Sequence, residues 1–194
     1  MCRTLAANGY RLGVGFRGDG ERAAGLAAEL SGGGHLPLAL PVTDSAALHA
    51  AAARVEDEIG ACDVVVNCAG TTRYVPHGDL DALDDSLIDE ILATNVRGPI
   101  ATVRAFLPLL RRSGHPGGAV VVNISSIAAV TATGSNVVYC ASKAAVDNVT
   151  RSLGRALAPH VRVVSVSPGL VDTPFVDSLD RVWRDEQESR TPLG

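Results

Sequence analysis

The sequence predicts a single α/β domain built on a doubly wound, mostly parallel sheet. Three observations support this fold class. The chain has 194 residues, which is the length of one domain. Short apolar segments alternate with helical segments along almost the whole chain, as expected for parallel strands joined by helices. The apolar segments are nearly continuous, which is typical of strands that helices cover on both faces.

The expected elements follow one another in strand–helix order. Glycines and helix-capping residues such as Asp44 mark their ends. We expect strands at 11–16, 36–40, 62–67, 119–124 and 161–167. We expect helices at 21–30, 45–59, 86–112 with an irregularity at Gly98-Pro99, and 138–159, while residues 1–8 form the end of a helix. The charged tail 172–194 is predicted to be a loop followed by a helix.

Composition excludes several classes of function. The formal net charge of −4 argues against a nucleic-acid-binding surface. No run approaches the ~18 apolar residues of a membrane span, and the start lacks the apolar core of a secretory signal. The four cysteines, at positions 2, 62, 68 and 140, have no C-x-x-C spacing. We therefore expect reduced thiols in a cytoplasmic protein, with no disulfide and no metal site.

Tyr139 and Lys143 lie four residues apart in an expected helix, so their side chains share one face. A nearby ammonium favours the phenolate and lowers the pKa of a phenol from about 10. A tyrosine adjusted in this way exchanges a proton with an alcohol or carbonyl near neutral pH. Any helix can hold such a pair by chance, but Lys143 is the only lysine among the 17 basic residues.

Several small and polar residues fall where the expected strands end. They are Ser126, Asp44, the turn 67–70 and the loop 168–173. The carboxyl ends of parallel strands share one edge of the sheet, where ligands bind. Each feature alone is ordinary turn or cap chemistry, but their convergence predicts a ligand site. Asn95 falls inside an apolar helix, where its amide needs partners, and a structural role is the simpler interpretation.

Together these residues resemble the short-chain dehydrogenase/reductase superfamily, in its compact soluble branch near the 3-oxoacyl-carrier-protein reductases. The spacing from Ser126 to Tyr139 and then to Lys143 is that of the family's catalytic residues, and 139–145 is typical of it. Residues 67–70 resemble its N-N-A-G turn, with Cys68 in place of the second Asn. Asn95 falls where the fourth catalytic residue belongs. The resemblance implies a Rossmann-like fold.

The resemblance also implies roles for individual residues. Tyr139 would be the general acid/base and Ser126 would polarise the substrate oxygen. Lys143 would lower the tyrosine pKa and bind the nicotinamide ribose, and Asn95 would hold a water. The implied cofactor-binding residues are Arg17, Asp44, Asn67, Ala69, Gly70, Tyr139, Lys143, Pro168, Gly169 and Thr173.

The implied reaction is hydride transfer between a carbonyl and an alcohol of a small molecule. An acid at the end of the second family strand favours NAD, but Arg17 stands there and could pair with a 2′-phosphate. We therefore expect NADP, with NAD as the alternative if Arg17 is only a solvated loop charge. Relatives pair subunits through two long helices, so a homodimer or homotetramer is expected. A Ser/Lys hydrolase using Ser126 is disfavoured, because no glycine-flanked nucleophile turn surrounds it.

The family's first strand, its glycine-rich phosphate loop and its last strand have no counterpart in the sequence, so the domain is expected to be truncated at both ends. One hypothesis is a piece of an ordinary reductase. The other is a truncated, non-catalytic paralogue that acts as a binding or assembly subunit. In either case we expect residues 1–194 alone to bind dinucleotide poorly. Strands 11–16 and 62–67 would pair directly, leave an unpaired seam, or receive a strand from elsewhere.

Overall fold

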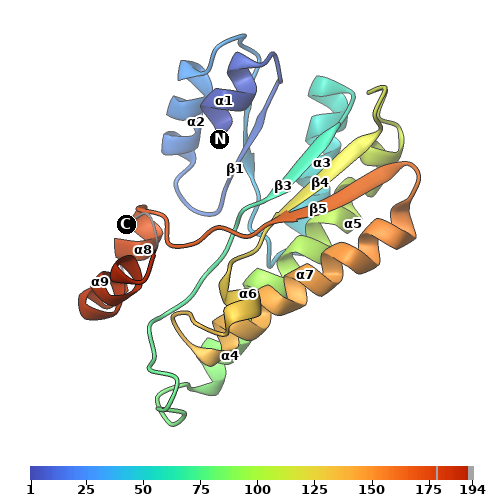
Figure 1. Ribbon diagram of the computed structural model, residues 1–194. Coiled ribbons are helices and arrows are strands. Elements are labelled where there is room, and N and C mark those ends of the chain that lie inside the picture. Colours follow the sequence, from blue (N-terminus) through green and yellow to red (C-terminus); the bar gives the residue numbers. More distant parts are fainter. Residues whose placement is uncertain (178, 192–194) are drawn as a thin grey trace.

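The computed structural model contains the predicted alternation of strands and helices (Figure 1). It describes residues 1–177 and 179–191. The strands are β1 (Gly13–Phe16), β2 (Leu36–Ala39), β3 (Val64–Asn67), β4 (Ala119–Ile124) and β5 (Val161–Val166). The helices are α1 (Cys2–Ala7), α2 (Gly20–Glu29), α3 (Ser45–Ile59), α4 (Asp85–Leu92), the π-helix η1 (Ala93–Arg97), α5 (Gly98–Arg111), α6 (Ala128–Thr131), α7 (Val137–Leu157), α8 (Pro174–Asp177) and α9 (Arg181–Ser189).

The strands form two separate parallel sheets. One sheet pairs β1 with β2, and the other has the order β3-β4-β5. Within the described residues, β1 and β3 pair with no strand on the sides that face each other. Of the three arrangements expected for strands 11–16 and 62–67, the structure therefore has the unpaired seam.

Helices fix the two sheets in place. Helix α2 packs on β1 and β2, and α3 packs on β2 and on α5. Helix α5 also packs on β3 and β4, while α7 packs on β5 (Figure 1). The main core lies between these helices and the strands, where Leu48, Val121 and Leu110 are almost completely buried.

The second sheet is covered more on one face than on the other. Burial alternates along β3 and β4, and in β5 the side chains of Val164 and Val166 are about half exposed. The expectation of helices on both faces thus applies to these strands only in part. Apolar sequence alone did not separate a fully covered strand from one covered on a single face.

The predicted helix 86–112 is interrupted. Its irregularity is the π-helix η1, which lies just before Gly98-Pro99 rather than at it. The predicted cap of α3 is confirmed, because Asp44 Oδ1 accepts the N–H groups of Ala46 and Ala47. The tail contains α8 and α9 as a loop-and-helix segment, and its residues 192–194 lie outside the described residues. Within the described chain, no helix combines the length and apolarity that a membrane span needs.

Candidate active site

Helix α7 begins at Val137, so Tyr139 lies in its first turn. Asn136 caps it, with Oδ1 accepting a hydrogen bond from the Tyr139 backbone N–H at 2.7 Å. The Asn136 amide also donates to the Arg73 carbonyl at 2.8 Å and to Thr72 Oγ1 at 3.1 Å. A side-chain cap satisfies N–H groups that a helix start leaves unpaired. Asn136 therefore fixes the first turn of α7 against the loop that follows β3.

Lys143 is buried one helical turn after Tyr139, with 6% of its surface exposed. Its Nζ lies 5.6 Å from the centroid of the Tyr139 ring and donates to the Ile124 carbonyl at 2.9 Å. That hydrogen bond uses one of the three N–H groups of the ammonium. Ser125 Oγ donates to the Lys143 carbonyl at 3.2 Å, which joins α7 to the end of β4 a second time.

The pKa of Tyr139 differs from the expectation. Burial raises the pKa of the phenol above its ordinary value of 10.0, the Ser126 side chain lowers it as a hydrogen-bond partner, and Cys140 raises it. The expectation that Lys143 brings about a lowered pKa is wrong for this structure, because desolvation of the phenolate dominates. Burial in turn lowers the pKa of Lys143, while the charges of Cys68 and Asp147 raise it.

Asn95 lies in η1 and is 1% exposed. Its Oδ1 accepts the Thr71 N–H at 2.8 Å, and its Nδ2 donates to the Thr71 carbonyl at 3.0 Å and to Ser142 Oγ at 3.1 Å. A Cβ added to Gly70 would lie 3.6 Å from Asn95 Oδ1 and 3.9 Å from Lys143 Nζ. The turn after β3, the π-helix and α7 therefore meet around Gly70.

The other predicted residues of the turn 67–70 differ in exposure. Asn67 is buried, and its Nδ2 donates to Asn123 Oδ1 on the neighbouring strand at 2.8 Å. Asn123 in turn donates to Thr150 Oγ1 at 2.9 Å. Cys68 and Ala69 are exposed at the end of β3. Asn67 thus stabilises the strand end, while the residues after it are open to a ligand.

The loop after β5 lies beside the segment that carries Ser126. The Ile127 N–H donates to the Pro168 carbonyl at 3.0 Å, and a Cβ on Gly169 would lie 3.9 Å from Ile127 Cδ1. Thr173 is exposed farther along this loop, where its Oγ1 donates to the Val171 carbonyl at 3.3 Å.

Arg17 and Asp44 lie near the ends of β1 and β2, on the other side of the seam from β3. Arg17 is exposed immediately after β1. One carboxylate oxygen of Asp44 caps α3, as described above. The structure records no contact, within its described residues, that joins either side chain to Tyr139 or Lys143.

Comparison with known proteins decides the family. The family model described as short chain dehydrogenase matches residues 1–182. The chain belongs to the short chain dehydrogenase family.

Relatives of this short chain dehydrogenase come from several bacteria. A protein of Streptomyces violaceoruber named as ketoacyl reductase 2 of the granaticin polyketide synthase is 38% identical over 187 residues, which are 93% of this chain and 70% of that protein. The D-threitol dehydrogenase of Mycolicibacterium smegmatis is 37% identical over 158 residues, 80% of this chain and 58% of that protein.

A solved structure of similar fold is the gluconate 5-dehydrogenase of Burkholderia cenocepacia J2315 in complex with NADP and tartrate. Its TM-score is 0.86 at 27% identity, and the match covers 100% of this chain and 75% of that one. Several curated relatives match this short chain dehydrogenase over only 52% to 58% of their own length.

Sequence reasoning missed several polar residues that hold the site of this short chain dehydrogenase together. They are Asn123, Asn136, Ser142 and Thr150. Two of them left a signal in the sequence. Asn123 interrupts a run of valines in an expected strand, and Asn136 is a capping residue just before an expected helix. Ser142 and Thr150 left none, because hydroxyl residues are common on helix surfaces.

Proposed function

We propose that this short chain dehydrogenase is a nicotinamide-dependent oxidoreductase that interconverts a carbonyl and an alcohol of a small molecule. The observation that carries the proposal is the side-chain pairing of Ser126 with Tyr139, with the buried ammonium of Lys143 below the ring. A hydroxyl pair of this kind can orient a substrate oxygen and exchange a proton with it.

In the proposed mechanism Ser126 hydrogen bonds to the substrate oxygen and polarises it. Tyr139 Oη gives a proton to that oxygen in the reductive direction and takes it back in the oxidative direction. Asn95 acts as a positioning residue, because its amide fastens Thr71 and the turn after β3 to α7 through Ser142. Lys143 holds its position through Ile124 and keeps N–H groups for a ligand.

The residues present fit a nicotinamide nucleotide at this edge. Lys143 has donors beyond the one that binds Ile124, and the exposed Gly70 lies next to it, since an added Cβ would be 3.9 Å from Lys143 Nζ. Lys143, Asn67, Ala69 and Gly70 would hold the ribose side, and Pro168, Gly169 and Thr173 would contact the nicotinamide. A bound nicotinamide supplies or accepts the hydride.

We further propose that the cofactor is NADP, with NAD as the alternative. Arg17 is exposed immediately after β1, where a guanidinium can pair with a phosphate through charge-assisted hydrogen bonds. Asp44 would contact the adenine with the carboxylate oxygen that does not cap α3.

We also propose that the chain forms a homodimer or homotetramer through α5 and α7. Ile100 on α5 and Val137 at the start of α7 are each about 40% exposed, and Ala141 and Ala144 are exposed on α7. Light scattering after size exclusion measures the mass of the assembly, and a monomer over the whole accessible concentration range would contradict this proposal.

The central experiment compares Tyr139→Phe with the matched variant Tyr10→Phe. Because residues 1–194 alone are expected to bind dinucleotide poorly, the assay uses NADP(H) or NAD(H) in large excess. We expect slow turnover of ketones or secondary alcohols, and we expect Tyr139→Phe to reduce that rate by a factor of about 10² to 10⁴. Dinucleotide binding, measured by thermal shift, should persist in both variants, and Tyr10→Phe should retain turnover. Full turnover by Tyr139→Phe would remove the phenol from its proposed role.

A further inference from the structure

Asp147 is an acidic residue of α7 that the proposed mechanism does not use. It lies one helical turn after Lys143, on the same face of the helix, and residues four apart on a helix have Cβ atoms about 5–6 Å from each other. The side chain is half-buried, and its Oδ1 is a buried oxygen that accepts no hydrogen bond from the described residues. A buried polar atom without a partner is destabilising, so its presence calls for a physical reason.

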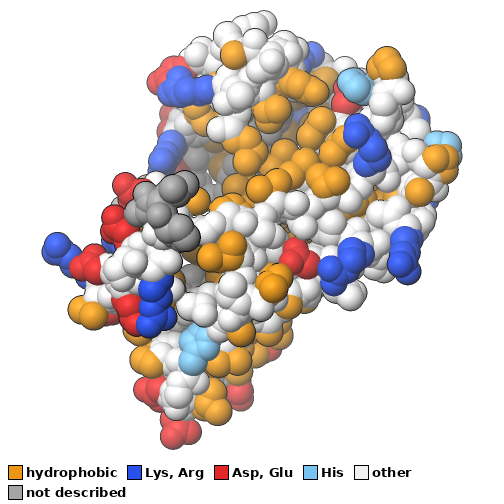
Figure 2. All heavy atoms as spheres, viewed as in Figure 1, with side chains coloured by type: hydrophobic (Ala, Val, Ile, Leu, Met, Phe, Trp, Pro, Cys, Tyr) orange, Lys and Arg blue, Asp and Glu red, His pale blue; other side chains and the backbone are white. Residues whose placement is uncertain are grey.

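The arginines of α7 do not provide that reason. Asp147 is the only acidic residue of this helix, which also carries Arg151 and Arg155. Figure 2 shows mainly basic side chains among the charged groups over β5 and α7. Both arginines are exposed, and neither forms an ion pair with Asp147 in the part of the chain that the structure describes. Asp147 therefore buries an oxygen although exposed guanidinium groups are present on the next two turns.

The preceding turn of the helix carries a buried cation, Lys143. Its side chain is 6% exposed, and its Nζ has one hydrogen-bond partner within the described residues, the neutral carbonyl of Ile124 at 2.9 Å. Burial lowers the pKa of Lys143, whereas the charges of Cys68 and Asp147 raise it. An ammonium and a carboxylate oxygen, each short of partners, thus lie one turn apart on one helix face.

The residue type at position 143 makes an opposite charge important. A buried guanidinium keeps its proton, but a buried lysine loses its proton readily. Lys143 is the only lysine of a chain whose other sixteen residues of this charge class are arginines, as the total of 17 less one shows. An opposite charge within about 4–6 Å favours the charged form of a group. Position 143 is therefore a place where the charge depends on its neighbours.

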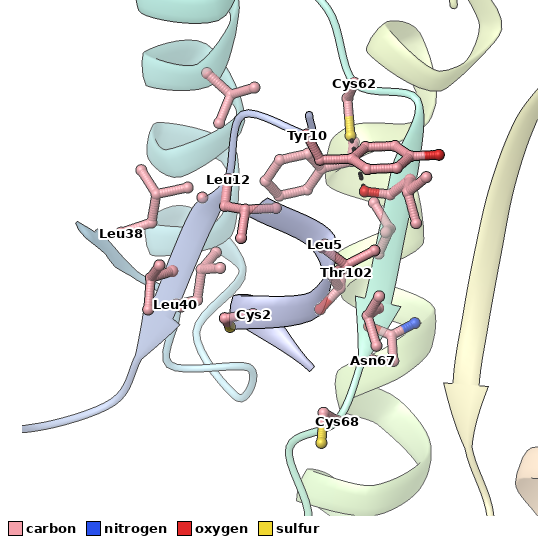
Figure 3. A pocket seen from close by; sticks show the side chains of 18 of the residues that line it. Cys2, Leu5, Tyr10, Leu12, Leu38, Leu40, Cys62, Asn67, Cys68 and Thr102 are labelled. Atoms are coloured by element: carbon pink, nitrogen blue, oxygen red, sulfur yellow. Dashed lines mark hydrogen bonds between the residues drawn. The ribbon is translucent and has the colours of Figure 1, made fainter. Parts of the chain in front are cut away.

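Three titratable groups lie around the Lys143 ammonium. The ring of Tyr139 has its centroid 5.6 Å from Nζ. Cys68 lies just past the end of β3 (Figure 3), and its charge raises the pKa of Lys143 more than that of Asp147 does. However, a thiol is mostly protonated in the neutral range, whereas a carboxylic acid is ionised there. Near neutral pH the negative charge that acts on Lys143 is consequently that of Asp147.

The charged groups of the elements that pack against α7 lie elsewhere. These elements are β5, α6, η1 and α4, and α6 has no charged residue. Arg162 of β5 lies beside Gly117, where an added Cβ would be 3.5 Å from its guanidinium. Arg97 of η1 donates to the Thr43 carbonyl at 2.9 Å. The carboxylates of α4 are exposed, and they belong to Asp85, Asp89 and Glu90.

We propose that the Asp147 carboxylate is the internal counter-charge that keeps the Lys143 ammonium protonated beside Tyr139. Asp147 acts through Lys143, so it is a positioning residue of the site. Loss of the Lys143 proton would remove the positive charge next to the phenol and one of the donors available to a ligand. The relation between the two charges is independent of the proposed function, but its consequence for turnover rests on that function.

The test measures the titration of Lys143 directly. Because the chain has a single lysine, the full chain labelled with carbon-13 lysine gives one Cε signal, and its chemical shift follows loss of the Nζ proton. We expect the midpoint of Asp147→Asn to lie about one pH unit below that of the wild type, because one opposite charge is lost. Asp147→Glu keeps the charge and should restore most of the difference. The difference should persist in high salt, since buried charges are screened less than exposed ones.

Two control variants separate this effect from other charge effects. Asp89→Asn removes an exposed carboxylate of α4 and should leave the Lys143 midpoint unchanged. Cys68→Ser removes the other group that raises the pKa of Lys143. The proposal is overturned if Asp147→Asn has the wild-type midpoint, if Asp89→Asn lowers the midpoint equally, or if only Cys68→Ser lowers it. Should the amide spectrum show that Asp147→Asn does not fold, Asp147→Ser takes its place in the same titration.

Turnover gives a second measurement that distinguishes this inference from the proposed function. If both hold, the pH above which turnover declines should fall in Asp147→Asn by the same amount as the Lys143 midpoint. A lowered midpoint in a chain whose wild type shows no turnover would contradict the proposed function and support the counter-charge. An unchanged midpoint together with wild-type turnover would contradict the counter-charge and leave the proposed function in place.

Discussion

Lys143 Nζ donates a 2.9 Å hydrogen bond to the Ile124 carbonyl, which fastens α7 to the carboxyl end of β4. The contact brings a buried ammonium to the sheet edge at which Ser125 and Ser126 follow the strand. Burial of an ammonium is costly, and the cost is visible in the lowered pKa of Lys143, which the charges of Cys68 and Asp147 offset only in part.

The first prediction concerns the pH dependence of stability due to Lys143. Its pKa in the folded chain is below 10.5, so in the interval between the folded pKa and 10.5 the unfolded chain binds more protons. The contribution of Lys143 to the free energy of unfolding therefore increases as the pH rises through that interval. Lys143→Met should remove this gain, while Arg151→Met on the exposed surface of α7 should keep it.

Urea unfolding at a series of alkaline pH values measures the effect as the difference between wild type and variant. Taking the difference is necessary because Tyr139 acts in the opposite direction. Its raised pKa means that the folded chain binds more protons above pH 10.0, so its contribution to stability falls there. A wild-type minus Lys143→Met difference that stays flat, or falls, would contradict the lowered pKa of Lys143.

The second prediction concerns Asn95. Asn95→Ala leaves the Thr71 N–H and carbonyl without their side-chain partner and removes the bond that Ser142 Oγ accepts, while Ser142 still donates to the Tyr139 carbonyl. Leaving buried polar groups unpaired costs about 1–3 kcal/mol, so we expect a loss of unfolding free energy in that range. Asn8→Ala removes an exposed amide that donates to the Thr4 carbonyl, and it should cost less than about 1 kcal/mol. Equal losses in the two variants would show that the Asn95 amide does not hold the turn after β3.

The sequence predicted the elements of this fold better than their assembly. Helix 45–59 and strand 119–124 match α3 and β4 at both ends, because Asp44 and Gly60 mark the first and a buried valine run marks the second. The division of the sheet was foreseen only as one of three options. Whether β1 pairs with β3 depends on contacts between segments that are far apart in the sequence. No local pattern around Gly13 or Val64 encodes such contacts.

In the candidate site, too, the sequence predicted the local positions of residues but not the interactions between distant segments. The positions of Tyr139 and Lys143 on one helix follow from their spacing, and the placement of Ser126 follows from the strand before it. The pKa direction of Tyr139 did not follow, because it depends on how deeply the folded chain buries the phenol, which residue spacing does not show. The same is true of the link from Asn67 to Thr150 through Asn123, which joins three separate segments.

The third prediction separates the two roles of Asp44. Asp44→Ala should lower the free energy of unfolding by about 1 kcal/mol, because the Ala46 and Ala47 N–H groups lose their cap. Asp44→Ser should restore most of that stability, since serine is also a good cap. If the carboxylate contacts the adenine, both variants lose dinucleotide affinity alike. Full affinity in Asp44→Ser would limit Asp44 to capping.

The fourth prediction concerns cofactor choice. Arg17→Ala should weaken NADPH binding by about tenfold or more and leave NADH binding nearly unchanged, because only NADPH carries the 2′-phosphate that a guanidinium would pair with. The control variant is Arg22→Ala on the neighbouring helix α2, which also removes one positive charge. Titration of each nucleotide by fluorescence measures both affinities. Parallel weakening of NADPH and NADH would remove Arg17 as the residue that selects the phosphate.

The last prediction concerns Cys62 at the seam. Burial raises the pKa of its thiol from 9.0 to about 11, with a further contribution from the charge of Asp63. Between these pH values the unfolded chain loses the proton and the folded chain keeps it, so stability falls as the pH rises through this interval. A difference of two pKa units corresponds to roughly 2–3 kcal/mol, and Cys62→Ala should remove that decline.

Thiol alkylation provides an independent measurement of the same property. Near pH 8, iodoacetamide should label the exposed Cys68 well before Cys62, because the thiolate is the reactive form and Cys62 holds little of it. Mass spectrometry of the labelled peptides gives the two rates. Cys62 reacting as fast as Cys68 in the folded chain would mean that the seam admits water to the thiol and that its pKa is near the ordinary value.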